Sequence, residues 1–382
     1  MTQGPSHRLI SLDAFRGATI AAMLLVNNPG AWSEVYAPLR HAAWHGWTPT
    51  DLVFPFFLWI VGVAITFALA QRVAAGADHH QLRAHVWRRA GIIFLLGLLL
   101  NAFPFGLLSA QHFSFATLRL PGVLQRIALC YLAASAIFLR STWRGQVAWT
   151  GGLLVVYSAL LMLVPVPGYG AGQLNASGSL PWWIDSHLLA GHTWSGAPAP
   201  GFDPEGLLST LPAIATTLLG VLAGQILRTG ATDSVKALRL GGLGVTLLIS
   251  GLGLVPWMPI NKNLWTSSFT LFTAGAAALI CAGFYWLIEV RRYRRWATPL
   301  IIYGSNAIVI FVLAGLLGRL LGVISWVGPT GAAVTLKGWI YATAFAPYAT
   351  PVNASLLFAV AFVLLHLLIA GLLWRRQWFV RI

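Results

Sequence analysis

Two histidines and a carboxylate lie close together in one short stretch of the sequence, residues 41–51 (HAAWHGWTPTD). His41 and His45 belong to a polar, Trp-rich segment, and Asp51 follows at the start of an apolar run. A neutral imidazole can accept a proton from a reacting group or form a covalent intermediate. Two histidines at this spacing need a helix to share one metal ion, and Gly46 and Pro49 disfavour a helix here. The stretch therefore predicts acid–base or nucleophilic chemistry and no metal.

The residues after this stretch predict the helix that must position it. Thr48 is a suitable N-cap, Pro49 suits the first helical position, and Asp51 would lie at the positive end of the helix dipole. From Leu52 to Gly62 the residues are almost all apolar. The ionisable groups thus lie at a membrane boundary, where they are costly and typically functional.

Composition and hydrophobic periodicity predict an all-α, polytopic integral membrane protein. Of its 382 residues, 58% are hydrophobic and only 9% are charged, whereas a soluble domain carries about 25% charged residues. Apolar segments of about 20 residues recur along the chain, as transmembrane helices require. We expect ten of them, in one domain over residues 1–382: 11–28, 51–71, 86–104, 121–139, 146–164, 207–227, 238–257, 264–288, 299–321 and 354–374.

The distribution of charge predicts the orientation of these segments. The net charge of +15 could indicate nucleic-acid binding, but most of the 24 Lys and Arg residues fall in alternate loops. This pattern is the positive-inside asymmetry of membrane proteins, and it argues against a nucleic-acid partner. It predicts that both termini are cytoplasmic and that the long loops at about 29–50, 166–206 and 323–353 are extracytoplasmic.

Polar residues from separate parts of the chain gather on the predicted outer side. With Trp residues around them, they suggest a pocket for a polar acceptor such as a sugar. Each also has a structural explanation: Arg126 could extend to the interface, and Asp203 and Glu205 could cap a helix. The set comprises Asn27, His41, His45, Asp51, Arg126, His192, Asp203, Glu205, Asn261, Lys262 and Asn263.

Several motifs, in order over nearly the whole chain, resemble the heparan-α-glucosaminide N-acetyltransferase family. That family comprises a lysosomal membrane enzyme that uses acetyl-CoA, and bacterial homologues. The matching stretches are RLISLDAFRG (8–17), LVNNPG (25–30), HAAWHGWTPTDLVFPFF (41–57), PGVLQRIALCYL (121–132), VPVPG (164–168), WID-x-x-LL (183–189), DPEG (203–206), INKNLW (260–265), YGSNAI (303–308) and WFVRI (378–382).

The resemblance implies a transmembrane acyltransferase fold, cytoplasmic acetyl-CoA as co-substrate and a glucosamine amine on the far side of the membrane. The family's catalytic histidine falls on His41 and its active-site asparagine on Asn27. His45 stands where the lysosomal enzyme has Asn, so we assign it no catalytic role. We therefore expect His41, Asn27 and Asp51 to be catalytic. We expect the following residues to bind substrate: Arg126, His192, Asp203, Glu205, Asn261, Lys262, Asn263 and Trp265.

Two mechanisms fit this chemistry. In direct transfer, neutral His41 takes a proton from the amine, Asp51 orients the imidazole and Asn27 donates to the developing oxyanion. In the alternative, His41 carries the acetyl group transiently. O-acylation of an extracytoplasmic polysaccharide and glycan transport are the remaining functional alternatives.

The expected setting is a bacterial inner membrane. We expect the chain to begin directly at the membrane core, without the luminal N-terminal region of the lysosomal enzyme. Amino sugars from chitin, peptidoglycan or another glycan are therefore the expected acceptors. Membrane lipid is an expected partner, and glycine-rich helices permit a homo-oligomer.

Overall fold

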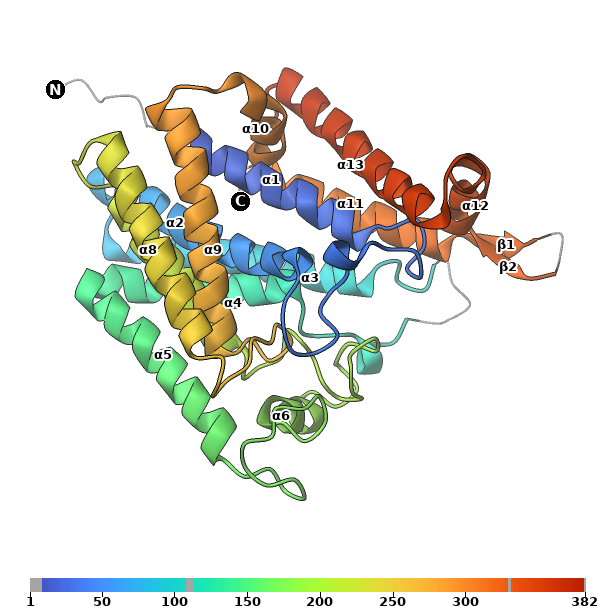
Figure 1. Cartoon of the computed structure of the whole chain (residues 1–382), viewed down its shortest axis with the longest axis horizontal. Coiled ribbons are helices and arrows are strands. Elements are labelled where there is room, and N and C mark those ends of the chain that lie inside the picture. Colours follow the sequence, from blue (N-terminus) through green and yellow to red (C-terminus); the bar gives the residue numbers. More distant parts are fainter. Residues whose placement is uncertain (1–8, 108–112, 329–330, 381–382) are drawn as a thin grey trace.

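The chain folds into a bundle of helices with one small hairpin (Figure 1). The computed structural model describes residues 9–107, 113–328 and 331–380. Strands β1 (Ser325–Val327) and β2 (Ala333–Thr335) pair antiparallel. The α-helices in the described residues are α1 (Ile10–Asn27), α2 (Val53–Ala74), α3 (His79–Ala102), α4 (Val123–Arg140), α5 (Trp143–Leu163), α6 (Leu180–Leu188), α7 (Thr210–Leu227), α8 (Asp233–Gly253), α9 (Ser267–Tyr285), α10 (Thr298–Ser305), α11 (Ala307–Val323), α12 (Leu336–Ala344) and α13 (Pro351–Arg375).

The architecture confirms an all-α polytopic membrane protein. Every predicted apolar segment falls on a helix. Within the described residues, eight helices are long and apolar enough to span a membrane. The predicted segment 299–321 is not one straight helix, because α10 and α11 are bent by 70° at a break, and counting this pair as one span gives nine. The remaining predicted segment, 86–104, lies in α3, whose first half carries Arg83, Arg88 and Arg89.

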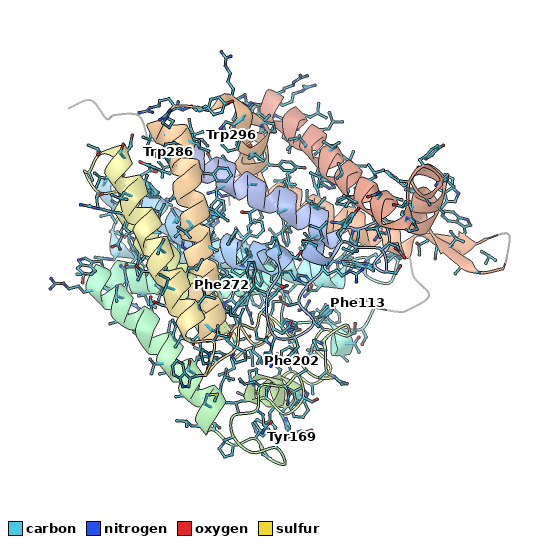
Figure 2. The ribbon with its side chains drawn as sticks, viewed as in Figure 1. Phe113, Tyr169, Phe202, Phe272, Trp286 and Trp296 are labelled. Atoms are coloured by element: carbon cyan, nitrogen blue, oxygen red, sulfur yellow. The ribbon has the colours of Figure 1, made fainter. Side chains whose placement is uncertain are left out.

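Apolar side chains remain exposed on the outer helices, as contact with lipid requires. Val155 on α5, Ile249 on α8 and Leu368 on α13 are each more than 60% exposed. Aromatic side chains lie toward both ends of the molecule, with Trp286 and Trp296 far from Tyr169 (Figure 2). Trp and Tyr commonly lie at membrane–water interfaces. The cytoplasmic location of both termini stays a prediction, and residues 1–8 and 381–382 lie outside the described part of the chain.

Close helix packing fixes α2, which follows the His41–Asp51 stretch. A Cβ atom on Gly62 would lie 1.9 Å from the Thr217 carbonyl oxygen, and one on Gly220 would lie 2.0 Å from the Trp59 carbonyl oxygen. Only glycine allows α2 and α7 to approach this closely. Trp59 is fully buried beside this crossing. The packing therefore gives the start of α2 a rigid base.

The long loops gather at one end of the bundle. The α1–α2 loop descends to meet the α8–α9 loop and the loops around α6 (Figure 1). The Trp44 indole N–H donates to the Leu174 carbonyl at 2.8 Å, and the Asn261 amide donates to the Trp44 carbonyl at 2.9 Å. Side chains far apart in the sequence are thereby brought to one place.

Candidate active site

Asp51 organises the loop that carries His41. It lies in the 3-10 helix η2 (Pro49–Leu52), which leads into α2, and Thr48 and Asp51 form a reciprocal capping box. Oδ2 of Asp51 accepts from the backbone N–H groups of Ala42 and Thr48, each at 3.0 Å. The carboxylate is 1% exposed, and these donors offset the cost of burying it. The predicted helix start at Thr48–Asp51 is confirmed.

His41 and Asp51 form a hydrogen-bonded pair. Nδ1 of His41 lies 2.6 Å from Oδ1 of Asp51, and the His41 side chain is 47% exposed. Since a carboxylate only accepts hydrogen bonds, Nδ1 carries the proton and donates a hydrogen bond to Oδ1 of Asp51. The other ring nitrogen, Nε2, then keeps its lone pair. This arrangement suits a general base, whose proton-accepting nitrogen must be free.

Lys262, from the α8–α9 loop, lies beside this pair. Its Nζ is 3.0 Å from Nδ1 and 3.4 Å from Nε2 of His41, and 3.6 Å from Oδ1 of Asp51. Burial lowers the pKa of Lys262, against the attraction of Asp51 and Glu205. The residue therefore faces the histidine, which sequence spacing alone could not indicate.

Asn261 joins the α8–α9 loop to the His41 loop. Its side-chain amide donates to the Trp44 carbonyl, and its Oδ1 accepts from the Leu264 N–H at 2.8 Å. Nδ2 of Asn261 also lies 3.3 Å from Nδ1 of His45. Burial lowers the pKa of His45. Asn261 is fully buried. These contacts hold Lys262 against His41.

Arg119 binds two of the predicted carboxylates. It forms two parallel contacts with Asp203, at 2.9 and 2.7 Å, and its Nη2 lies 2.5 Å from Oε2 of Glu205. Burial opposes the charged form of Arg119, but Asp203 and Glu205 outweigh it and raise its pKa. The guanidinium also lies over the Trp194 ring, 5.6 Å from its centre. Arg119 is not among the predicted site residues, and its only signal in the sequence is its position just before the PGVLQR motif.

A cavity of about 630 Å³ opens onto His41. Its volume falls in the range of about 300–1,000 Å³ typical of small-molecule sites. Asn27, at the exposed end of α1, lines it together with Arg119 and Trp194. The predicted site residues that line this cavity are Asn27, His41, Asp51, Glu205, Lys262 and Asn263.

The other five predicted site residues lie outside this lining. Nδ1 of His192 donates to the Leu118 carbonyl at 2.8 Å, which holds the segment before Arg119. Contact of these five residues with the acceptor stays a prediction: Arg126, His192, Asp203, Asn261 and Trp265.

Arg126 is buried inside the protein. It is 1% exposed and donates to the Gly206 carbonyl at 3.0 Å and to the Ser209 hydroxyl at 2.5 Å. It also lies over the Trp265 ring, 5.2 Å from its centre. The alternative that Arg126 extends to the membrane interface does not hold, because its side chain is held inside the protein.

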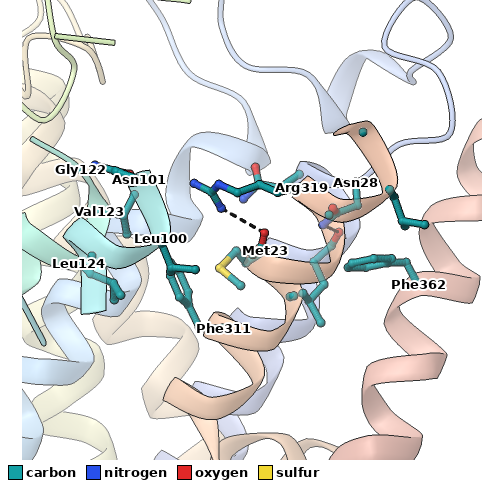
Figure 3. Close-up of a pocket in the computed structure, with 18 of the residues that line it drawn as sticks. Met23, Asn28, Leu100, Asn101, Gly122, Val123, Leu124, Phe311, Arg319 and Phe362 are labelled. Atoms are coloured by element: carbon teal, nitrogen blue, oxygen red, sulfur yellow. Dashed lines mark hydrogen bonds between the residues drawn. The ribbon is translucent and has the colours of Figure 1, made fainter. Parts of the chain in front are cut away.

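A second cavity, of about 570 Å³, adjoins the first (Figure 3). The two share Asn27 and Arg119 in their linings. Arg319 on α11, which donates to the Gly315 carbonyl at 3.1 Å, and Lys337 on α12 also line the second cavity. Among the described residues that line it, three are basic and none is acidic. The two cavities thus share part of their walls, and the second has a cationic side.

Metal-ligating groups do not gather in this region. Within residues 9–107, 113–328 and 331–380, no three His, Cys, Asp or Glu side chains lie close enough to hold a metal ion. The polar side chains that line the cavity beside His41 include instead one imidazole, carboxylates, amides and cations.

Comparison with known proteins identifies the family. The family model described as heparan-alpha-glucosaminide N-acetyltransferase, catalytic, matches residues 8–256. Heparan-alpha-glucosaminide N-acetyltransferase from Mus musculus is 27% identical over 357 residues, covering 80% of this chain and 53% of the relative. That from Homo sapiens is 28% identical over 357 residues, covering 80% and 52%. The chain spans about half the length of these curated relatives. The chain therefore belongs to the heparan-alpha-glucosaminide N-acetyltransferase catalytic family.

Proposed function

We propose that this protein transfers the acetyl group of acetyl-CoA to the amine of a glucosamine-type sugar, with His41 as the general base. One observation carries the proposal: Asp51 holds His41 by Nδ1, so that its other ring nitrogen keeps its lone pair beside a cavity of about 630 Å³. Membership of an N-acetyltransferase family supports the reaction type.

The transfer needs three events at this site. The sugar's ammonium group loses a proton, and the neutral amine attacks the thioester carbonyl while His41 takes a second proton. The C–N bond forms, the C–S bond breaks, and CoA leaves as a thiolate that is then protonated. Asn27 lines the cavity and can donate its amide N–H to the oxyanion that forms during attack.

Other residues of the lining suit an amino-sugar acceptor. Glu205 accepts from Arg119 and can also attract the sugar's ammonium group, and Asn263 can bond a hydroxyl. Trp194 adds an aromatic surface beside Arg119. We infer that the acceptor enters at the end of the bundle where the loops gather, on the extracytoplasmic side. Acetyl-CoA comes from the cytoplasm in this proposal, and the setting is a bacterial inner membrane.

Thiol release tests the proposal. The purified protein in detergent is incubated with acetyl-CoA, with and without glucosamine, and free CoA thiol is measured. We expect acceptor-dependent release by the wild type and a decrease of about 10²-fold or more in His41→Ala. His187→Ala is the matched control, because His187 is exposed on α6 and does not line the cavity. Equal release by wild type and His41→Ala would place the base elsewhere.

A further inference from the structure

The amine of Lys262 occupies the place where the proposed acceptor amine must react. Its Nζ lies 3.0 and 3.4 Å from the two ring nitrogens of His41, and both residues line the same cavity. The acceptor amine must lie equally close to His41, because it must give its proton to this imidazole. Lys262 therefore presents a primary amine to the proposed base before any acceptor binds.

Hydrogen bonds hold the backbone around Lys262, and its side chain reaches into the cavity. Oδ1 of Asn261 accepts from the Leu264 N–H, and the Lys262 carbonyl accepts from the Trp265 N–H at 3.1 Å. The side chain is 19% exposed and ends in the cavity. A lysine has four flexible methylene groups, so small rotations can carry its Nζ toward a bound thioester.

We propose that Lys262 is itself an acetylation site: when no acceptor is bound, the protein transfers the acetyl group of acetyl-CoA to Nζ of its own Lys262. The inference rests on the proposed function and extends it to a modification of the enzyme. The neutral amine attacks the thioester carbonyl, forming a C–N bond, and His41 takes the proton that the amine loses. The C–S bond breaks, and CoA leaves as a thiolate that takes up a proton.

The local electrostatics support this reaction and define its consequence. Burial lowers the pKa of Lys262, which increases the share of the neutral, nucleophilic amine. Acetylation removes the positive charge 3.6 Å from Oδ1 of Asp51 and places an amide in the cavity. Since the acetylated side chain fills the position of the acceptor amine, we expect it to block acceptor turnover.

Labelling of the intact protein tests the inference. The purified full chain is incubated with radiolabelled acetyl-CoA without acceptor, denatured and treated with hydroxylamine, which removes acetyl from imidazole and thiol groups but leaves amides. The chain contains only three lysines, Lys236, Lys262 and Lys337, so the site is easily assigned by peptide mass spectrometry. We expect stable label on Lys262, suppressed by saturating glucosamine.

Variants give this experiment its controls. Lys262→Arg should lose the stable label, whereas Lys236→Arg should keep it, because Lys236 lies at the start of α8 and pairs with Asp233. His41→Ala should slow labelling about a hundredfold. Equal labelling of all three lysines, or stable label that survives in Lys262→Arg, would overturn the inference. Turnover of glucosamine without stable label would overturn it while leaving the proposed function intact. Absence of both turnover and label would contradict the proposed function itself.

Discussion

Replacing Asp51 with Asn should leave the fold in place and disable His41. In the wild type, Oδ1 of Asp51 accepts from His41 and Oδ2 accepts from the N–H groups of Ala42 and Thr48. The amide oxygen of the variant must keep facing these two backbone donors, so its NH₂ group faces His41. That group donates to Nδ1, which must then give up its proton to Nε2. The nitrogen that was free to accept a proton is lost.

The structure gives the size of this effect. To recover the active tautomer, the Asp51→Asn variant must break the new hydrogen bond and bring two N–H groups face to face. It also loses a charge-assisted hydrogen bond of 2.6 Å. Together these cost about 3–6 kcal/mol, or about 10²- to 10⁴-fold in rate. Because His41 is 47% exposed, water can replace part of the lost interaction, so we expect the lower half of this range.

The assay is acceptor-dependent CoA release by the wild type and by Asp51→Asn. Asp78→Asn is the matched control: Asp78 caps α3 by accepting from the Gln81 N–H at 2.7 Å, and Asn caps equally well. Activity of Asp51→Asn within about threefold of wild type would refute an orienting role for Asp51.

Three further variants have defined outcomes. Arg119→Met should lower the free energy of unfolding by about 3 kcal/mol in denaturation experiments, because it leaves fully buried Asp203 without its cation. Adding Asp203→Asn should restore part of the lost stability, and an unchanged stability of Arg119→Met would contradict the prediction. Burial raises the pKa of Asp185 from 3.8 to about 7, so the contribution of Asp185 to stability falls as pH rises through that interval. The thermal unfolding temperature of Asp185→Asn should therefore depend less on pH than that of wild type, and equal pH dependence would disprove the prediction. Asn27→Ala should lower kcat about 10²-fold with an unchanged unfolding temperature, and unchanged kcat would remove Asn27 from the oxyanion role.

Local signals in the sequence were sufficient for the long apolar helices and for the start of α2, but not for α6, which lies in a stretch predicted as a loop. Thr48, Pro49 and Asp51 specify a capped helix start through contacts within four residues, and the apolar segments specify the bundle. The break between α10 and α11 was missed, because its cause is distant. Nδ2 of Asn306 donates to the Trp378 carbonyl at 2.9 Å, and its Oδ1 accepts from the Val380 N–H at 3.0 Å. These partners lie some 70 residues later, where no local pattern reveals them.

In the candidate site too, the sequence could predict some residues but not the contacts between residues that are distant in the chain. The sequence placed Asn27, His41 and Lys262 on one side of the membrane, and the structure brings all three to one cavity. It could not show that Lys262 contacts His41, because 221 residues separate them. Nor could it select Arg119, whose importance comes from the carboxylates 84 and 86 residues later.

Transfer of isotopically labelled acetyl from acetyl-CoA to glucosamine tests the central claim most directly. The purified wild type and His41→Ala are compared, and the sugar product is identified by mass spectrometry as an amide that survives mild base. The account predicts labelled N-acetylglucosamine from the wild type and almost none from His41→Ala. Product formation at equal rates by both proteins, or a labelled ester in place of the amide, would contradict it.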